Sequence, residues 1–356
     1  MTIRACRAGR HARSACPAAA GHHRGRRPRT STPGIRRSVA PLQSTRRAEP
    51  CQAAPPRVYA GSVNRAVDYV LHNLAEPLLL EDVARAAGFS PFHFHRVFRA
   101  HMGETLGAFV RRVRLERALY LLSHRRGATM TSIALACGFS SSSDFSRAFR
   151  ACHGVSPRQF DVAAFRRSRR EDMRIAVRPV DTTSAADSAR AGGNPDGFAV
   201  HVRRLAARRV AYLRVRQPYT GDHVPKAANR LLAWAQRRGL ADGQWLGYQW
   251  DDPEIVPLGR CRYDVGVEIP DAAAVSEEVN VTWFPETVVA EVEIKGTLDL
   301  ELRALQWIFL TWLPGSGYAP AHQPMFEAWN GRPYAHGTTH FDLRIQLPVV
   351  DASTPL

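Results

Sequence analysis

Two short stretches of this 356-residue chain carry basic and hydrogen-bonding side chains at helical spacing. Guanidinium groups bind phosphate and the O6/N7 edge of guanine, whereas hydroxyl and imidazole groups hydrogen-bond to several base edges. This chemistry suits contact with double-stranded DNA. Arg99, Arg150 and Arg158 suit phosphate, which positions a protein on DNA without reading sequence. The candidate base-reading residues are Phe92, His93, His95 and Arg96 in the first stretch, and Ser142, Ser143, Ser146 and Arg147 in the second.

Both stretches lie in a segment that occurs twice. The first copy is LEDVARAAGFSPFHFHRVFRAHMG, residues 80–103, and the second is MTSIALACGFSSSSDFSRAFRACHG, residues 130–154. The triplet GFS at residues 88–90 returns at residues 138–140. A repeat of this kind indicates a duplicated supersecondary unit.

Each copy predicts a helix, a glycine turn and a second helix. Gly88 and Gly138 suit the positive φ that ends a helix. Ser90 and Pro91 suit the cap and first position of the next helix. This order is that of a helix-turn-helix unit. One long helix is predicted between the copies, over residues 105–122, and a last helix is expected to begin at Ser156-Pro157.

The formal charge of +17 is concentrated in the front half of the chain. Residues 1–57 contain 13 Arg and one Glu, and few large apolar side chains, so we expect a basic, disordered extension. This extension either adds sequence-blind attraction to DNA or has no role. Residues 58–172 contain 17 basic and 10 acidic residues, whereas the remainder is close to neutral. The rear half therefore needs a different kind of partner.

The rear half, residues 198–350, mixes predicted strands and helices and is also duplicated. RYDVGVEIP at residues 262–270 superposes on HFDLRIQLP at residues 340–348 with a constant offset, 340 − 262 = 78. The same offset relates Trp234 to Trp312, which favours matched core positions. We predict two strand–helix–strand–strand units that form one sheet about a pseudo-two-fold axis, with a groove between them.

Glu327 is the sharpest candidate for ligand chemistry in the rear half, because its counterpart under the offset is Gln249. Only one half therefore supplies a carboxylate. A carboxylate with aromatic neighbours suits a planar cation, through charge pairing and cation–π attraction. The alternative for Glu327 is a solvated strand residue. The expected aromatic neighbours are Tyr248, Trp250, Trp283, Trp307 and Trp329.

The front repeat resembles the two halves of the AraC/XylS-type DNA-binding domain. The resemblance lies in GFSPFHFHRVFRAHMG and GFSSSSDFSRAFRACHGVSPRQF and covers about residues 63–167. It implies a transcription factor, often an activator, that places two recognition helices on one asymmetric DNA site. The serine run at residues 140–143 favours weak direct readout by the second unit. The alternative is a protein-interaction module with solvated arginines.

The rear half resembles the GyrI-like effector-binding domain, on the segments RYDVGVEIP, MFEAW and HFDLRIQLP. The resemblance implies a small-molecule effector, commonly cationic and aromatic, in the groove between the halves. It also implies that Glu327 contacts the positive charge of the effector. An enzymatic alternative is a hydrolase of small reactive compounds with Glu327 as general base and Tyr248 nearby. We found no nucleophile motif, phosphate loop or metal-ligand spacing in the sequence.

We therefore expect a multidomain regulator, in which an all-α double helix-turn-helix domain precedes an α+β domain of two pseudo-symmetric units. The expected partners are promoter DNA, a small-molecule effector and RNA polymerase, with no enzymatic activity, cofactor, metal or membrane. The six scattered cysteines favour a reducing, cytoplasmic location at the nucleoid. The expected boundaries are 1–57 for the extension, 58–170 for the DNA-binding domain, 171–197 for a linker and 198–356 for the effector domain.

Overall fold

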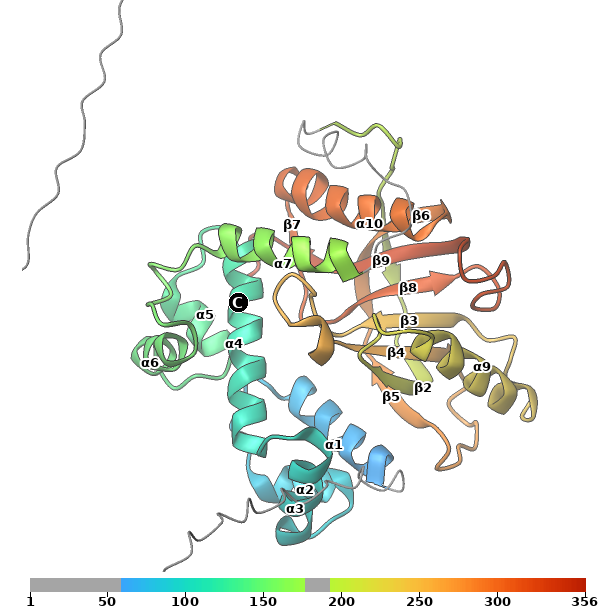
Figure 1. The fold of residues 1–356 in the computed structure, drawn as a ribbon, viewed down its shortest axis with the longest axis horizontal. Coiled ribbons are helices and arrows are strands. Elements are labelled where there is room, and N and C mark those ends of the chain that lie inside the picture. The colour runs from blue at the N-terminus through green and yellow to red at the C-terminus, as the bar shows by residue number, and fades with distance from the viewer. Residues whose placement is uncertain (1–58, 177–192) are drawn as a thin grey trace, which may run out of the picture. The chain divides into compact units, whose positions relative to one another are not determined.

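The computed structural model describes residues 59–176 and 193–356. The expected basic extension and most of the expected linker lie outside the described residues. The front part is helical, as predicted (Figure 1). Its helices are α1 (Ala60–His72), α2 (Leu80–Ala87), α3 (Pro91–Met102), α4 (Leu106–His124), α5 (Met130–Ala136), α6 (Ser142–His153) and α7 (Val162–Ala176).

The two helix-turn-helix units form as the repeat predicts. Gly88 and Gly138 follow the first helix of each unit with φ of 78° and 79°. This region of backbone space costs glycine little. A side chain at Gly138 would also collide with the Leu74 carbonyl oxygen, at 2.3 Å. Ser90 is the N-cap of α3, although its hydroxyl makes no capping hydrogen bond. The turn is therefore fixed mainly by the glycine and by packing.

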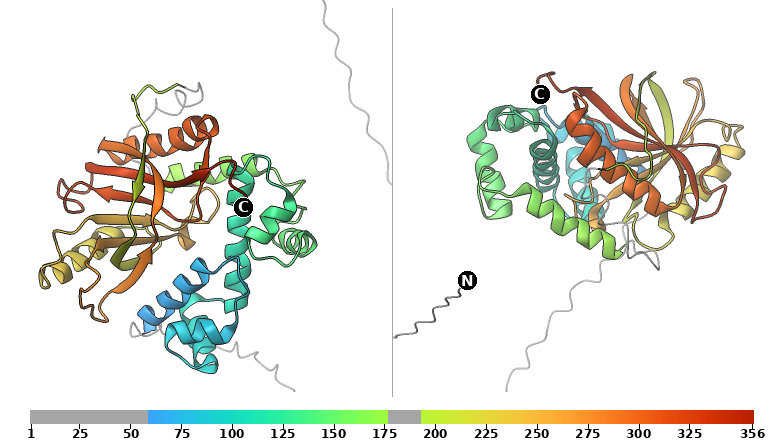
Figure 2. Two further views of the ribbon diagram at one scale, coloured as in Figure 1. Left: turned by 180° about the vertical axis from the view of Figure 1, so that it is seen from behind. Right: turned by 90° about the horizontal axis from the view of Figure 1, so that it is seen from above.

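Helix α4 connects the two units, which lie at its opposite ends (Figures 1 and 2). The first unit buries Phe94 and Phe98 of α3 with Phe109 of α4. The second buries Phe145 and Phe149 of α6 with the other end of α4. The long helix thus holds two apolar cores apart, and the core of the second unit also includes Ile255, Val256 and Cys261 of the rear part.

The expected start of the last helix at Ser156-Pro157 is wrong. Residues 157–159 form a turn, and α7 begins at Val162. Asp161 accounts for this start, because its carboxylate accepts the Ala164 N–H at 2.8 Å. This hydrogen bond caps the first turn. The helix then continues to Ala176. The expected division between the DNA-binding domain and the linker stays a prediction.

The rear part is one antiparallel sheet in the order β1-β6-β9-β8-β3-β4-β2-β5, with β7 paired to β9. Two helices, α9 (His223–Gln236) and α10 (Leu298–Trp307), pack on it. A π-helical segment, Ile308–Trp312, continues α10. The strands are β1 (His201–Leu205), β2 (Arg208–Arg216), β3 (Trp245–Gln249), β4 (Arg262–Glu268), β5 (Asn280–Phe284), β6 (Thr287–Gly296), β7 (Tyr318–Pro320), β8 (Met325–Trp329) and β9 (Phe341–Asp351).

The sheet confirms the internal duplication. The units β2-α9-β3-β4 and β6-α10-β8-β9 meet where β3 pairs with β8. Tyr248 lies opposite Phe326, the residue to which the sequence offset carries it. The pseudo-two-fold axis therefore passes between these two residues. The structure adds what the pattern did not predict: β1 pairs with β6, and β5 pairs with β2.

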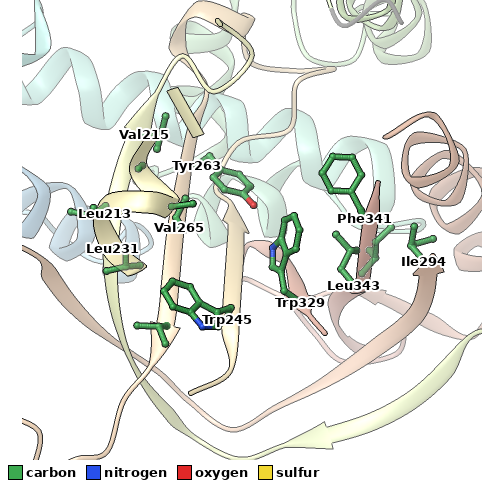
Figure 3. Packing of buried hydrophobic residues seen from close by; sticks show 14 of the residues in the cluster. Leu213, Val215, Leu231, Trp245, Tyr263, Val265, Ile294, Trp329, Phe341 and Leu343 are labelled. Atoms are coloured by element: carbon green, nitrogen blue, oxygen red, sulfur yellow. The ribbon is translucent and has the colours of Figure 1, made fainter. Parts of the chain in front are cut away.

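The sheet has two chemically different faces, because side chains alternate along each strand. The face under α9 and α10 carries the main core, including Trp245, Tyr263 and Trp329 (Figure 3). Trp234 of α9 is buried in this core, as predicted. The opposite face carries a smaller cluster with Tyr212, Tyr248 and Phe326.

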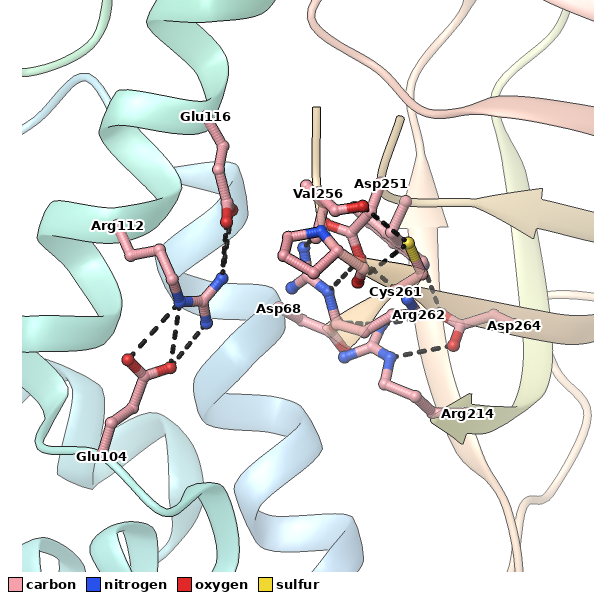
Figure 4. Close-up of polar contacts among 12 residues, drawn as sticks. Asp68, Glu104, Arg112, Glu116, Arg214, Asp251, Val256, Cys261, Arg262 and Asp264 are labelled. Carbon is pink, nitrogen blue, oxygen red and sulfur yellow. Dashed lines mark hydrogen bonds and ion pairs between the residues drawn. The ribbon is translucent and has the colours of Figure 1, made fainter. Parts of the chain in front are cut away.

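Arg214 on β2 contacts two elements at once (Figure 4). Its guanidinium donates to Asp264 of β4 at 2.7 and 2.8 Å and to Asp68 of α1 at 2.8 Å. The Tyr212 hydroxyl also donates to Asp68. The side chain of Arg214 is only 2% exposed. These ion pairs are therefore shielded from water and salt, and helix α1 is attached to the sheet through a buried charge cluster.

Arg214→Met should destabilise the chain by about 3–5 kcal/mol, because the change leaves two buried carboxylates without their cation. The measurement is urea unfolding of the full chain, followed by tryptophan fluorescence. The matched control is Arg237→Met, which removes an exposed ion pair with Glu278. This control should cost less than about 1 kcal/mol. Equal unfolding midpoints for the two variants would contradict this role of Arg214.

Candidate functional site

The exposed face of α3 carries most of the first predicted recognition set. Phe92 is 78% exposed, and His95, Arg96 and Arg99 are also exposed. His93 is exposed as well, but its ring lies edge-on to Phe89, 5.0 Å away between centroids. Helix α3 therefore turns its apolar side to the core and presents a basic, aromatic side to solvent.

Helix α6 presents a less varied surface. Ser143, Arg147 and Arg150 are exposed, whereas Ser142 and Ser146 are half-buried. The Ser146 hydroxyl donates to the Ser142 carbonyl at 2.8 Å, so part of its hydrogen-bonding capacity is used within the helix.

The serine run before α6 has a structural use. The Ser141 hydroxyl accepts the Asp144 N–H at 3.1 Å, and this bond caps the helix. Asp144, which was not among the predicted residues, pairs with Arg147 at 3.6 Å. By contrast, Arg96 and Arg150 form no ion pair with any residue that the structure describes. Both helices thus offer an exposed guanidinium without an ion pair among the described residues, and the greater share of sequence reading by α3 stays a prediction.

In the rear domain, Glu327 occupies the centre of β8, directly opposite Gly247 of β3. Its carboxylate accepts the Tyr263 hydroxyl at 2.5 Å and the Gln249 side-chain amide at 2.8 Å. A Cβ at Gly247 would lie 1.8 Å from the Tyr263 hydroxyl and 2.7 Å from the Glu327 carboxylate. Gly247 therefore provides the space in which this hydrogen bond forms.

Trp329 completes the surroundings of Glu327 on the same face of the sheet. The Tyr263 hydroxyl points toward its ring in Figure 3. Tyr334 packs against Trp329 with centroids 5.1 Å apart and has a φ of 59°. A positive φ is strained for a bulky residue, and such strain concentrates at functional sites.

Glu301 of α10 is a second acid at this site. Glu301 is 4% exposed and Glu327 is 7% exposed, and their carboxyl groups are hydrogen-bonded to each other. Burial, and then the charge of Glu327, raises the pKa of Glu301 well above its usual range. Burial also raises the pKa of Glu327, against hydrogen bonds from Tyr263 and Gln249 that lower it.

The structure does not gather all the aromatic residues expected around Glu327. Tyr248 lies on the opposite face of the sheet, where it stacks on Phe284 at 4.1 Å. Trp250 also lies there and donates to Asp264 at 2.5 Å. Trp283 is half-exposed on β5, and Trp307 packs against Phe198. Of the five predicted aromatic neighbours, Trp329 is the one placed beside the carboxylate.

These positions also bear on the hydrolase alternative. Glu327 and Tyr248 point to opposite faces, so they do not form the expected general-base pair. The nearby phenol is that of Tyr263, and burial raises its pKa well above the ordinary value. Tyr263 is therefore a neutral hydrogen-bond donor. Glu327 is buried, so it is not the solvated strand residue of the other alternative.

Sequence reasoning missed Tyr263 and Glu301. The sequence did contain a signal for Glu301, because this residue lies on the same helical face as the apolar residues Ala304 and Ile308. An acidic residue within a buried helical face needs an explanation. For Tyr263, the only signal in the sequence was that its counterpart under the offset, Phe341, lacks the hydroxyl.

Neither a metal site nor a membrane span emerges from the described residues. Within 59–176 and 193–356, no three His, Cys, Asp or Glu side chains are grouped so that they could hold a metal ion. No helix in the same part of the chain is both long and apolar enough to cross a bilayer.

Gly247→Ala should disrupt the Glu327 site, because its Cβ would occupy the space of the Tyr263 hydroxyl. Overpacking of this kind costs about 1–3 kcal/mol. The measurement is the thermal midpoint of the full chain. Gly259→Ala is the control, since no heavy atom lies within 4 Å of its Cβ position. If both variants melt with the wild-type chain, the space at Gly247 is not required.

Comparison with known proteins gives two family matches. Residues 83–162 match a helix-turn-helix domain, and residues 198–350 match a GyrI-like small molecule binding domain. A putative HTH-type transcriptional regulator of Escherichia coli is 34% identical over 98 residues, which is 28% of this chain and 41% of that protein. The chain thus spans less than half the length of that relative.

Two further relatives are covered more fully. An HTH-type transcriptional activator of Providencia stuartii is 33% identical over 95 residues, 27% of this chain and 70% of that protein. A DNA gyrase inhibitor of Serratia proteamaculans is 30% identical over 150 residues, 41% of this chain and 94% of that protein. The chain therefore belongs to the AraC-type helix-turn-helix family of transcriptional regulators and carries a C-terminal GyrI-like small-molecule binding domain.

Proposed function

We propose that this protein is a transcriptional regulator that binds promoter DNA with α3 and α6 and is controlled by a cationic, aromatic effector bound at Glu327. The observation that carries the effector part is a buried carboxylate, Glu327, that accepts several hydrogen bonds but has no basic partner among the described residues. A cationic ligand would supply the missing charge, and Trp329 would supply an aromatic surface.

The DNA part is supported by the geometry of the helical domain. Helix α4 has 19 residues, and a helix of this size is about 28 Å long. Successive major-groove segments on one face of DNA are separated by about 34 Å. The length of the spacer between the two units is thus of the same order as this separation.

Strand β4 offers a route between the two activities. Tyr263 reaches Glu327 on one face of the sheet, and the next residue, Asp264, holds Arg214 on the other. Arg214 in turn binds Asp68 of α1. A ligand that displaces the Tyr263 hydroxyl would shift β4 and so change the contact with the DNA-binding domain. In this proposal, β4 is the element whose position both sites bias.

We further propose that the protein acts in the cytoplasm as an activator that contacts RNA polymerase, and that its effector domain binds without turnover. The name of the Providencia stuartii relative, a transcriptional activator, supports the first point. The neutral Tyr263 phenol beside Glu327 supports the second, because it is a donor and not a base.

Arg96→Ala should weaken specific promoter binding by about 1–3 kcal/mol, because it removes an exposed guanidinium from the α3 surface. The measurement is fluorescence anisotropy with promoter and scrambled duplexes at one salt concentration. Arg237→Ala is the control, since it removes the same charge from the exposed surface of the effector domain. Unchanged promoter affinity in Arg96→Ala would show that α3 does not contact DNA as assigned.

Glu327→Gln should abolish the thermal stabilisation of the full chain by aromatic cations, because the ligand loses its counter-charge. A suitable first probe is N-methyl-para-phenylpyridinium, which carries a permanent charge and no ionisable proton. Glu293→Gln is the control, as Glu293 is an exposed carboxylate of β6. The recovered probe should be chemically unchanged. Equal stabilisation of both variants would remove Glu327 from the site, and steady consumption of the probe would favour an enzyme.

A further inference from the structure

The buried acidic residues of this protein fall into two groups. Six such residues are buried in the described part of the chain. Four of them bind an arginine: Asp68 and Asp264 bind Arg214, Asp251 binds Arg262, and Glu291 binds Arg203. The other two are Glu301 and Glu327, and no Arg, Lys or His among the described residues forms an ion pair with either.

These two acids bind each other instead. A hydrogen bond between two carboxyl groups requires a proton on one of them. Glu327 already accepts hydrogen bonds from Tyr263 and Gln249, which favour its charged form. No such donor to Glu301 is found among the described residues, and Glu301 is the more buried of the two. Glu301 is therefore the more favourable place for the proton, and Glu327 is the more favourable place for a negative charge.

The helix that carries Glu301 has an irregular end. Helix α10 runs directly into the π-helical segment Ile308–Trp312. The Trp307 indole N–H at this junction is buried and has no hydrogen-bond partner among the described residues. π-Helical turns are rare and occur frequently at functional sites. This irregularity is independent of the acidic pair and lies on the same element.

We propose that Glu301 stores a proton that the effector site releases when the ligand carries two positive charges, so that one site accepts both singly and doubly charged aromatic cations. This inference rests on the proposed effector binding at Glu327. The step is a simple ionisation: the Glu301 O–H bond breaks, the proton passes to solvent, and the carboxylate stays in place. No other bond changes and no co-reactant is needed.

Charge balance explains why a monocation and a dication should have different effects on the proton of Glu301. A buried net charge is costly, so the occupied site favours neutrality. A monocation neutralises Glu327 while Glu301 keeps its proton. A dication leaves one positive charge uncompensated until Glu301 ionises. The number of protons released should therefore equal the ligand charge minus one.

The other groups around the pair cannot provide this response. The titratable side chains that face it are Tyr263 of β4 and Tyr334 and Tyr219 of the neighbouring loops. Burial raises the pKa of each of these phenols, so each stays neutral near pH 7. Glu301 is thus the group that can exchange a proton.

The test compares two permanent cations of similar shape on the full chain, N-methyl-para-phenylpyridinium with one charge and methyl viologen with two. Calorimetric titrations in two buffers of different ionisation enthalpy count the protons released. By linkage, the dication should release about one proton and the monocation about none. The dication affinity should then rise about tenfold per pH unit while Glu301 is protonated in the free protein, and the monocation affinity should stay level.

Glu301→Gln separates this role from a structural one. Glutamine keeps a neutral N–H donor for Glu327 but cannot ionise. The variant should release no proton with methyl viologen, and the ratio of its dication affinity to its monocation affinity should fall well below that of the wild-type chain. A circular dichroism spectrum that matches the wild-type chain shows that the variant is folded.

The outcomes distinguish this inference from the proposed function. If neither probe binds, or if both bind Glu327→Gln as well as the wild-type chain, the effector assignment fails and the inference fails with it. If both probes bind through Glu327 but release equal numbers of protons, the proton-storing role of Glu301 is wrong and the effector site stands. Proton release that persists in Glu301→Gln would also overturn it.

Discussion

The contact of Arg214 with two carboxylates is the most deeply buried of the ion pairs that join the two domains, beside those of Arg166 and Arg170 with Asp252 and Glu254. Its guanidinium holds Asp264 within the sheet and Asp68 on the first helix of the DNA-binding domain, and little water reaches any of the three groups. One buried cation between two buried anions is stable only if all three are present, because loss of any member leaves an uncompensated charge. The same contact thus links α1 to the sheet and makes that link sensitive to the position of β4.

The alternation of side chains along β4 places the Arg214 cluster and the Glu327 site on opposite faces of the same strand. Consecutive residues of a strand point to opposite faces, so the side chains of Tyr263 and Asp264 contact different groups although the two residues are adjacent. Tyr263 belongs to the Glu327 site, and Asp264 belongs to the Arg214 cluster. A displacement of one moves the other by the rigidity of the strand. The proposed communication between effector and DNA would therefore need no long chain of contacts.

Much of the fold could be predicted from sequence because each duplicated unit repeats its residue pattern at a nearly constant spacing. The two GFS turns located both helix-turn-helix units. The constant offset between the rear units placed the pseudo-two-fold axis, which the pairing of Tyr248 with Phe326 confirms. The predicted start of α7 was wrong because two possible N-cap residues lie close together. Asp161, and not Ser156, caps the helix.

The site was harder to predict than the fold. Aromatic content identified candidates for cation binding but not the face of the sheet that each would occupy. A strand that is buried on both faces, such as β3, has no polar side to reveal its orientation. Tyr248 and Trp250 were therefore grouped with Glu327, although they lie across the sheet. Glu301 was missed because it is remote in sequence and only the packing of α10 brings it to Glu327.

Duplication and divergence together explain why there is one acidic site and not two. The counterparts of Glu327, Tyr263 and Glu301 are Gln249, Phe341 and His223, so the other half supplies no carboxyl group at these positions. Gln249 lies beside the axis and donates directly to Glu327 across it. Two carboxylates at these symmetric positions would repel each other in a buried place. The replacement of one by an amide turns a symmetric repulsion into a hydrogen bond, and leaves Glu327 without a basic partner among the described residues.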